Sequence, residues 1–107
     1  MQAGQGTKSV SVYVAIVEEE PEKAVGVWFP DLPGCFSAGD SLDEALTNAH
    51  GALRAYADVV REENRTLPRA RTLTELKSDP NVSPDLQTYM VALVPLDGGF
   101  KLRPAAE

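Results

Sequence analysis

The chain has 107 residues, of which 43% are hydrophobic and 24% charged, so it has the size and composition of one globular domain. Its formal net charge of −6 argues against nucleic-acid binding by this chain and suits a basic protein partner, although many acidic proteins have no such partner. A single cysteine excludes an internal disulfide and a multi-cysteine zinc site, and no apolar run reaches the roughly 18–20 residues of a membrane span. Because residues 1–8 contain no hydrophobic signal region, we expect a flexible leader there and a cytoplasmic protein.

Three short strands are predicted in the first part of the chain. Residues 10–17 alternate with the period of a β-strand, and residues 24–29 form a second apolar run. The acidic stretch between them, broken by Pro21, predicts the loop of an antiparallel hairpin. Residues 35–38 fit a third, shorter strand. One face of the first strand is predicted to carry Val10, Val12, Val14 and Ile16, and the other Ser11, Tyr13 and Ala15.

The stretch from Phe29 to Ala45 is expected to shape the fold rather than to carry out chemistry. Pro30 and Pro33 end the second strand, and Gly34 permits the positive φ angle of a tight reversal. Ser41, followed three residues later by a glutamate, predicts a capping box at the start of a helix. The residues expected to form this structural motif are Pro30, Asp31, Pro33, Gly34, Cys35, Gly39, Ser41 and Glu44.

One long helix and a shorter one are predicted next. Apolar residues at spacings of three and four indicate a helix from Leu42 to about Glu63, with Asn64 as a left-handed residue behind it. Residues 72–77 predict a short helix with its own capping box, and the Asp-Pro and Ser-Pro pairs at 79–80 and 83–84 are interpreted as turns. The arginines of the irregular segment are interpreted as solvated charges rather than a nucleic-acid site; they are Arg65, Arg69 and Arg71.

The last strand completes the predicted fold. Residues 88–96 are apolar on both alternating faces, which predicts a strand covered on both sides, and we expect it to lie parallel to the first strand. The fold class is α+β, a β-β-β-α-β open sheet over residues 9–97 with one long helix packed on one face, followed by a short tail at 98–107. One sheet face and at least one edge then remain for a second copy or another partner.

No catalytic, cofactor-binding or metal-binding set of residues is recognisable. His50, the single histidine, falls at the border of the apolar helix face and is interpreted as a packing residue. Cys35 lacks the basic neighbours that activate a thiol and is interpreted as a small buried hydrophobe. A nuclease-like set of Asp31, Asp40 and Asp43 is disfavoured, because metal-binding carboxylates of that kind project from strand interiors. The sequence therefore predicts a non-enzymatic domain.

Several stretches of the chain resemble the HicB antitoxin family. The specific part is Phe29-Pro30-Asp31-Leu32-Pro33-Gly34-Cys35, followed by Gly39-Asp40-Ser41-Leu42-Asp43-Glu44-Ala45. Weaker similarity continues at Asn48-Ala49 and at Ala92-Leu93-Val94-Pro95-Leu96. The resemblance implies a partial ribonuclease-H-like fold that lacks nuclease residues.

The same resemblance implies a protein–protein role. HicB antitoxins bind and block HicA, a small basic toxin of double-stranded-RNA-binding fold that cleaves mRNA with one histidine, and they commonly form dimers or tetramers. Full-length members usually carry a C-terminal helix-turn-helix or ribbon-helix-helix module that binds their own promoter. Only eleven residues follow Leu96, too few for either module, so no direct DNA binding is expected from this chain.

The leading hypothesis is an antitoxin-type domain that binds and neutralises a small basic mRNA-cleaving toxin of the HicA type, without a cofactor or a membrane. The alternative is a stand-alone homo-oligomeric HicB-like module with no toxin partner. The residues expected to contact a partner are Glu18, Glu19, Glu20, Glu22, Asp31 and Asp40.

Overall fold

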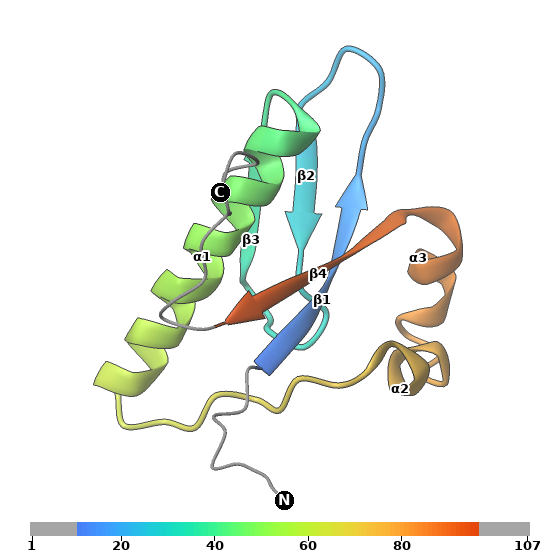
Figure 1. Ribbon diagram of the computed structural model, residues 1–107. Coiled ribbons are helices and arrows are strands. Elements are labelled where there is room, and N and C mark those ends of the chain that lie inside the picture. The colour runs from blue at the N-terminus through green and yellow to red at the C-terminus, as the bar shows by residue number, and fades with distance from the viewer. Residues whose placement is uncertain (1–10, 97–107) are drawn as a thin grey trace, which may run out of the picture.

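The computed structural model of the protein describes residues 11–96, so the leader expected at 1–8 and the tail expected at 98–107 lie outside the described residues. These described residues form four strands and three helices in the order β-β-β-α-α-α-β (Figure 1). The strands are β1 (Ser11–Glu18), β2 (Val25–Trp28), β3 (Phe36–Gly39) and β4 (Met90–Leu96). The helices are α1 (Leu42–Glu62), α2 (Leu73–Lys77) and α3 (Ser83–Thr88).

The four strands form one antiparallel sheet in the order β3-β2-β1-β4. The predicted hairpin of the first two strands is present, with Val17 opposite Val27. The long helix α1 covers one face of the sheet, and α2 and α3 lie on the other side (Figure 1). The α+β class with an open sheet and one long helix is therefore confirmed.

The predicted direction of the last strand is wrong, because β4 runs antiparallel to β1. Met90 lies opposite Val17 and Leu96 opposite Ser11, so β4 begins at the end of the sheet where β1 finishes. The reason is that the chain traverses the sheet twice between β3 and β4. It descends along α1 on one face and returns through α2 and α3 on the other, whereas a parallel strand needs a single crossover.

The predicted position of the last strand is also wrong. β4 is an edge strand paired only with β1 among residues 11–96, and it is not covered on both sides. The side chain of Leu93 is 62% exposed and that of Met90 is 45% exposed. The apolar sequence of β4 is typical of a central strand, but in this protein it forms an edge strand with exposed apolar side chains.

The main core lies between α1 and the sheet. Three residues of the helix, Ala45, Ala49 and Leu53, are fully buried against the sheet, which α1 contacts mainly at β3 and β2. Two of the three are alanines, whose small side chains let the helix axis approach the strands closely. The sheet residues buried on this side include Tyr13, Ala15, Val17, Val25, Val27 and Val94.

The second face of the sheet is not left for a partner alone, as the sequence had suggested, because α2 and α3 cover part of it. Val14 and Ile16 of β1 pack against Leu76 and Val82 in a smaller buried cluster. The ring of Tyr89 meets that of Trp28 edge-to-face at 5.5 Å between centroids, a favourable geometry for aromatic pairs.

Helix α3 occupies the stretch that was interpreted as a turn at Ser83–Pro84. The proline lies in its first turn, where the missing N–H removes no intrahelical hydrogen bond.

Helix α2 agrees with the short helix predicted at residues 72–77. The Thr72 side chain accepts a hydrogen bond from the Glu75 N–H, and the Glu75 carboxylate accepts one from the Thr72 N–H, so the capping box is complete.

The ends of α1 follow the sequence closely, with one difference. Ser41 Oγ accepts a hydrogen bond from the Glu44 N–H at 3.1 Å, but the Glu44 carboxylate accepts from the N–H of Asp40 rather than from that of Ser41. At the other end, Asn64 has φ of 58°. The N–H of Asn64 donates to Arg61 and that of residue 65 to residue 60, which is the Schellman arrangement of helix ends.

The turn between β2 and β3 is built as predicted. Gly34 has φ of 86°, a conformation that side chains disfavour, and the N–H of Cys35 donates to the carbonyl of Leu32.

Gly39 has a different role from that of a flexible turn residue. A Cβ atom there would lie 2.5 Å from the backbone nitrogen of Ala45, so β3 and the first turn of α1 touch only because residue 39 has no side chain.

We predict that Gly39→Ala lowers the free energy of unfolding by about 1–3 kcal/mol, because the start of α1 must shift to admit the new methyl group. Urea denaturation followed by circular dichroism measures this change. Gly26→Ala in β2 is the matched control, since nothing lies within 4 Å of a Cβ atom there. Equal losses in the two variants would contradict the close contact at Gly39.

Candidate partner-binding surface

Acidic residues gather at the end of the molecule formed by the β1–β2 loop and the start of α1. Glu19, Glu20, Glu22 and Asp40 line one shallow hollow of about 530 Å³ together with Lys23. The loop and the helix start lie next to each other at the same end of the sheet (Figure 1). The pairing of β1 with β2 and of β2 with β3 brings them together, although they are separated by about twenty residues in sequence. We call these four carboxylates the acidic end.

The carboxylates of the acidic end are largely uncompensated. Lys23 lies 3.4 Å from Glu20, and both side chains are exposed, so this pair is weak. Among residues 11–96, no cationic side chain is within 4.0 Å of Glu19, Glu22 or Asp40. The result is a compact, exposed negative surface that attracts a positively charged protein.

The backbone of the acidic loop is unusual at one residue. Glu22 has φ of 63°, in the left-handed region, where glycine and asparagine are common and a longer side chain costs roughly 1–2 kcal/mol. The conformation directs the chain back toward β2. A glutamate at this position adds a charge to the acidic end at some cost in local stability.

Two of the residues expected at the partner contact lie elsewhere. Glu18 is the last residue of β1, half-buried and opposite Gly26, so it is adjacent to the acidic end but outside the hollow. Asp31 is in the turn between β2 and β3, at the other end of these strands. Its side chain is only 5% exposed and is already bound within the fold.

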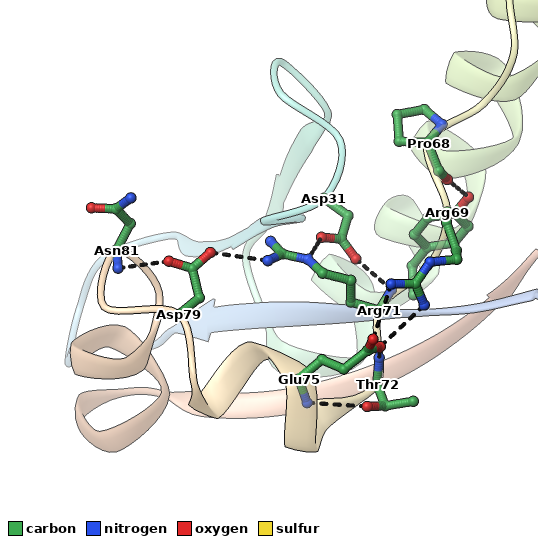
Figure 2. Close-up of polar contacts among 9 residues, drawn as sticks. Asp31, Pro68, Arg69, Arg71, Thr72, Glu75, Asp79 and Asn81 are labelled. Atoms are coloured by element: carbon green, nitrogen blue, oxygen red, sulfur yellow. Dashed lines mark hydrogen bonds and ion pairs between the residues drawn. The ribbon is translucent and has the colours of Figure 1, made fainter.

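Asp31 and Arg71 hold the irregular segment 65–72 against the β2–β3 turn. The carboxylate of Asp31 accepts hydrogen bonds from Arg71 Nε at 2.7 Å and from the Arg71 N–H at 2.8 Å. Arg71 also donates to Asp79 at 3.0 Å, and Asp79 accepts from the N–H of Asn81 (Figure 2). These contacts connect the turn, the segment and the α2–α3 connection, and we call them the Arg71 cluster.

The prediction of solvated arginines is therefore wrong for Arg71, whose side chain is 31% exposed, and agrees with Arg65 and Arg69, whose side chains are 56% and 70% exposed. Arg69 makes a two-bond contact with the Glu75 carboxylate beside the cluster, and Arg65 pairs with Glu63 (Figure 2 shows Arg69). The Arg69 hydrogen bonds and the N–H of Thr72 lower the pKa of Glu75 to about 2. The N–H of Asn81 and, next, Arg71 lower the pKa of Asp79.

Cys35 and His50 occupy structural positions. Cys35 is buried, and burial raises the pKa of its thiol to about 11, so the reactive thiolate is disfavoured at neutral pH. His50 is half-buried on α1 and lines a hollow between that helix and β4. Both positions agree with the packing roles predicted from sequence.

The arrangement of acids does not form a metal site within the described residues. Asp31 is bound to Arg71, whereas Asp40 lies at the acidic end. Among residues 11–96, no three His, Cys, Asp or Glu side chains are grouped so that they could hold a metal ion. In the same part of the chain, no helix has both the length and the apolar character needed to cross a membrane.

Comparison with known proteins identifies the family. A family model described as the HicB-like antitoxin of bacterial toxin–antitoxin systems matches residues 13–104. The chain belongs to this family. HicB-like proteins are antitoxins rather than enzymes, in agreement with the prediction of a non-enzymatic domain.

Individual relatives show the same relationship. An uncharacterized 14.9 kDa protein from the rep–hol intergenic region of Haemophilus phage HP1 is 34% identical over 68 residues, which are 64% of this chain and about half (48%) of the phage protein. The N-terminal domain of the Burkholderia pseudomallei antitoxin HicB is similar with a TM-score of 0.66 and 25% identity, over 80% of this chain and 98% of that domain. A chain of the HicA3–HicB3 toxin–antitoxin complex has the same fold, with a TM-score of 0.63 and 23% identity over 80% of this chain and 98% of that one.

Sequence reasoning missed the role of Arg71. In the sequence, Arg71 is one of several arginines in an irregular segment. That pattern does not distinguish an arginine bound within the fold from a solvated one. The partner of Arg71 is forty residues away at Asp31, so only the tertiary fold reveals the pair.

We predict that Asp31→Ala lowers the free energy of unfolding by about 2–4 kcal/mol, because it leaves Arg71 without its buried partner. Asp58→Ala is the control, since Asp58 also pairs with an arginine at 3.0 Å but is exposed, and its loss should cost less than about 1 kcal/mol. Chemical denaturation of the two variants measures both values. A change below about 1 kcal/mol for Asp31→Ala would show that the cluster does not secure the segment.

We predict that Glu75 makes the fold sensitive to acid. Because its pKa falls from 4.5 to about 2 on folding, the ionised carboxylate stabilises the protein above about pH 4.5, and this stabilisation is lost as the pH falls through about 2. Stability measured from pH 6 to pH 2 should fall less steeply in Glu75→Gln. Arg69→Gln should flatten the curve as well, since Arg69 is the main cause of the lowered pKa. Unchanged slopes in both variants would contradict the assignment.

Proposed function

We propose that this chain is an antitoxin domain that binds and neutralises a small basic mRNA-cleaving toxin of the HicA type in the cytoplasm. The observation that carries the proposal is the family match over residues 13–104, because that family consists of antitoxins from toxin–antitoxin systems. A protein of the same fold occurs with HicA3 in a toxin–antitoxin complex, and this supports the proposal.

The acidic end is the surface that we propose for the toxin contact. Its carboxylates are exposed, close together and without strong cationic partners among the described residues, so a basic protein gains Coulomb attraction there and displaces few existing contacts. Glu18 lies beside this surface and is included in the proposed contact. Asp31 is not included, since its carboxylate is occupied by Arg71.

The charge on this surface sets the expected behaviour of the complex. Attraction between exposed charges accelerates association and weakens as salt screens it over about 10 Å at 0.1 M ionic strength. A ribonuclease needs positive charge at its catalytic surface, because it binds the phosphates of RNA there. The acidic end binds that same positive surface and therefore covers the catalytic residues of the toxin. Inhibition then follows from competition with RNA and needs no chemistry on the antitoxin.

The test is co-expression with a small basic protein encoded next to this chain. We expect the chain to relieve growth arrest caused by that neighbour and to co-purify with it. Neutralising the loop by Glu19→Gln, Glu20→Gln and Glu22→Gln together should weaken binding about tenfold or more at low salt, mainly through a slower association rate.

The matched control removes the same number of charges from the far end of α1, by Asp58→Asn, Glu62→Gln and Glu63→Gln, and should bind almost normally. A chain that neither binds the neighbouring protein nor relieves its toxicity would refute the proposed function. Equal weakening by the two triple variants would keep the function but refute the acidic end as the contact surface.

A further inference from the structure

The outer edge of β4 is open within the described residues. β4 pairs with β1 on one side, and among residues 11–96 no strand pairs with its other side. β4 contains no charged residue, whereas exposed sheet edges normally carry charges that discourage further pairing. Leu93 is 62% exposed, and Val12, on the same face of the neighbouring strand, is 40% exposed. The edge therefore presents backbone groups and apolar side chains that a further strand would cover.

Pro95 indicates which backbone groups of β4 point outward. A proline has no N–H to donate, so on an edge strand its nitrogen normally faces away from the neighbouring strand. Successive residues of a strand direct their backbone groups to alternate sides, and the groups of Leu93 therefore also point away from β1. The outer edge thus offers the Pro95 carbonyl and both backbone groups of Leu93.

Residues 97–104 lie outside the described residues, and their sequence is typical of a hairpin return. Gly98-Gly99 is one of the two-residue pairs that connect antiparallel strands. Residues 100–103, Phe-Lys-Leu-Arg, alternate between apolar and basic side chains with the period of a half-buried strand, and Pro104 ends the pattern. The match to the HicB-like family model extends to residue 104, so it includes this segment.

We propose that residues 100–103 form a fifth strand that pairs antiparallel with the outer edge of β4. The occupant of the edge is then the segment of the same chain that directly follows it. With Gly98 and Gly99 as the two turn residues, Leu102 lies opposite Pro95. This register agrees with the outward direction of the Pro95 carbonyl, because the Leu102 N–H donates to it.

The same register determines where the pairing ends. Pro104 lies opposite Leu93, and the Leu93 N–H donates to the Pro104 carbonyl. Pro104 has no N–H to donate to the Leu93 carbonyl, so the ladder stops at this pair. The backbone groups of Lys101 point away from β4, since they alternate with those of Leu102.

The apolar side chains of the segment match one face of β4. Opposite residues of an antiparallel pair lie on the same face, so Phe100 and Leu102 fall on the face of Leu93 and Pro95. Val12 lies on that face of the neighbouring strand. The segment therefore covers the apolar surface that β4 leaves exposed.

The basic side chains of the segment match the other face. A hollow of about 720 Å³ lies between α1 and β4 and is lined by both Asp43 and Val94. Asp43 is exposed, and no cationic side chain among residues 11–96 is within 4.0 Å of it. Arg103, opposite Val94, brings a positive charge to this hollow. A shift of one residue would exchange the two faces and lose both matches.

The short connection favours this segment over a strand from another molecule. Residues 97–99 alone separate β4 from the proposed strand. A group tethered by so short a flexible connection has an effective concentration on the order of millimolar, and a strand of another molecule must displace it. The proposal is independent of the toxin contact, which uses the acidic end, and it is tested without a toxin.

The first test is hydrogen exchange of the full chain, followed by NMR. We expect the Leu93 and Leu102 amides to be protected equally over about a hundredfold range of protein concentration, because the pairing lies within one molecule. Protection that rises with concentration would assign the edge to a second copy. A Leu93 amide that exchanges freely would show an open edge, and either result overturns the proposal.

The second test compares two prolines in adjacent positions. Leu102→Pro removes the N–H that donates to Pro95, so exchange of the Leu93 amide should accelerate about tenfold or more. Lys101→Pro is the matched control, since its N–H points away from β4, and the rate should stay within about twofold. Both changes lie outside the β1–β4 ladder, and circular dichroism checks that the fold is retained. Equal effects of the two prolines would contradict the pairing.

The third test fixes the register with a disulfide. Val94→Cys combined with Arg103→Cys places two thiols on the same face of opposite residues, so mild oxidation should give an internal cross-link in a monomer. Val94→Cys combined with Leu102→Cys is the control, because its thiols lie on opposite faces and should not join. Cys35 is buried and does not compete. Cross-links between molecules, equal yields in both pairs, or no internal cross-link in the first pair would each overturn the proposal.

Discussion

The fold depends on the burial of β1 from both sides. Five consecutive residues, Tyr13 to Val17, are at most 3% exposed, which is possible only because layers of helix lie above and below the sheet and strands flank it on each side. β2 and β4 pair with this strand directly, and β3 joins the sheet through β2. α1 packs on the face of Tyr13, Ala15 and Val17, and the short helices pack on the face of Val14 and Ile16.

The two helical layers are held in different ways. α1 is a long helix with regular ends and a continuous buried face, so its position follows from apolar packing. α2 and α3 are short and bury few side chains, and the polar contacts of the Arg71 cluster supplement their small apolar cluster. Regions with fewer buried contacts open at lower free energy, so this layer is the part of the domain that is expected to open first.

Local sequence signals predicted the local structure well. The strand predicted at residues 10–17 is present from residue 11, and residue 10 lies outside the described residues. The caps at Ser41 and Thr72, the left-handed Asn64 and the reversal at Gly34 also depend on residues close in the chain, and all are present. The direction and position of β4 were not predictable in this way. They depend on the second traverse of the sheet through α3, whose Ser-Pro start is equally typical of a turn and of a first helical turn.

The candidate surface was predictable only in part. A run of glutamates in a hairpin loop is visible in sequence, but its proximity to Asp40 follows from strand pairing. Asp31 has the same residue type and lies in the same conspicuous motif, yet it is bound to Arg71 and mostly hidden. Residue type therefore identified the acids, and tertiary contacts decided which of them remain available.

The pairing of Ser11 with Leu96 places the two ends of the described domain side by side, at the end of the sheet opposite the β1–β2 loop (Figure 1). Attachment points at residues 11 and 96 therefore lie a strand length away from the acidic end. An immobilisation tag, a fluorescent protein or an additional folded module can be fused there while the loop stays accessible to a large ligand. The sheet therefore separates residues 11 and 96 from the acidic end.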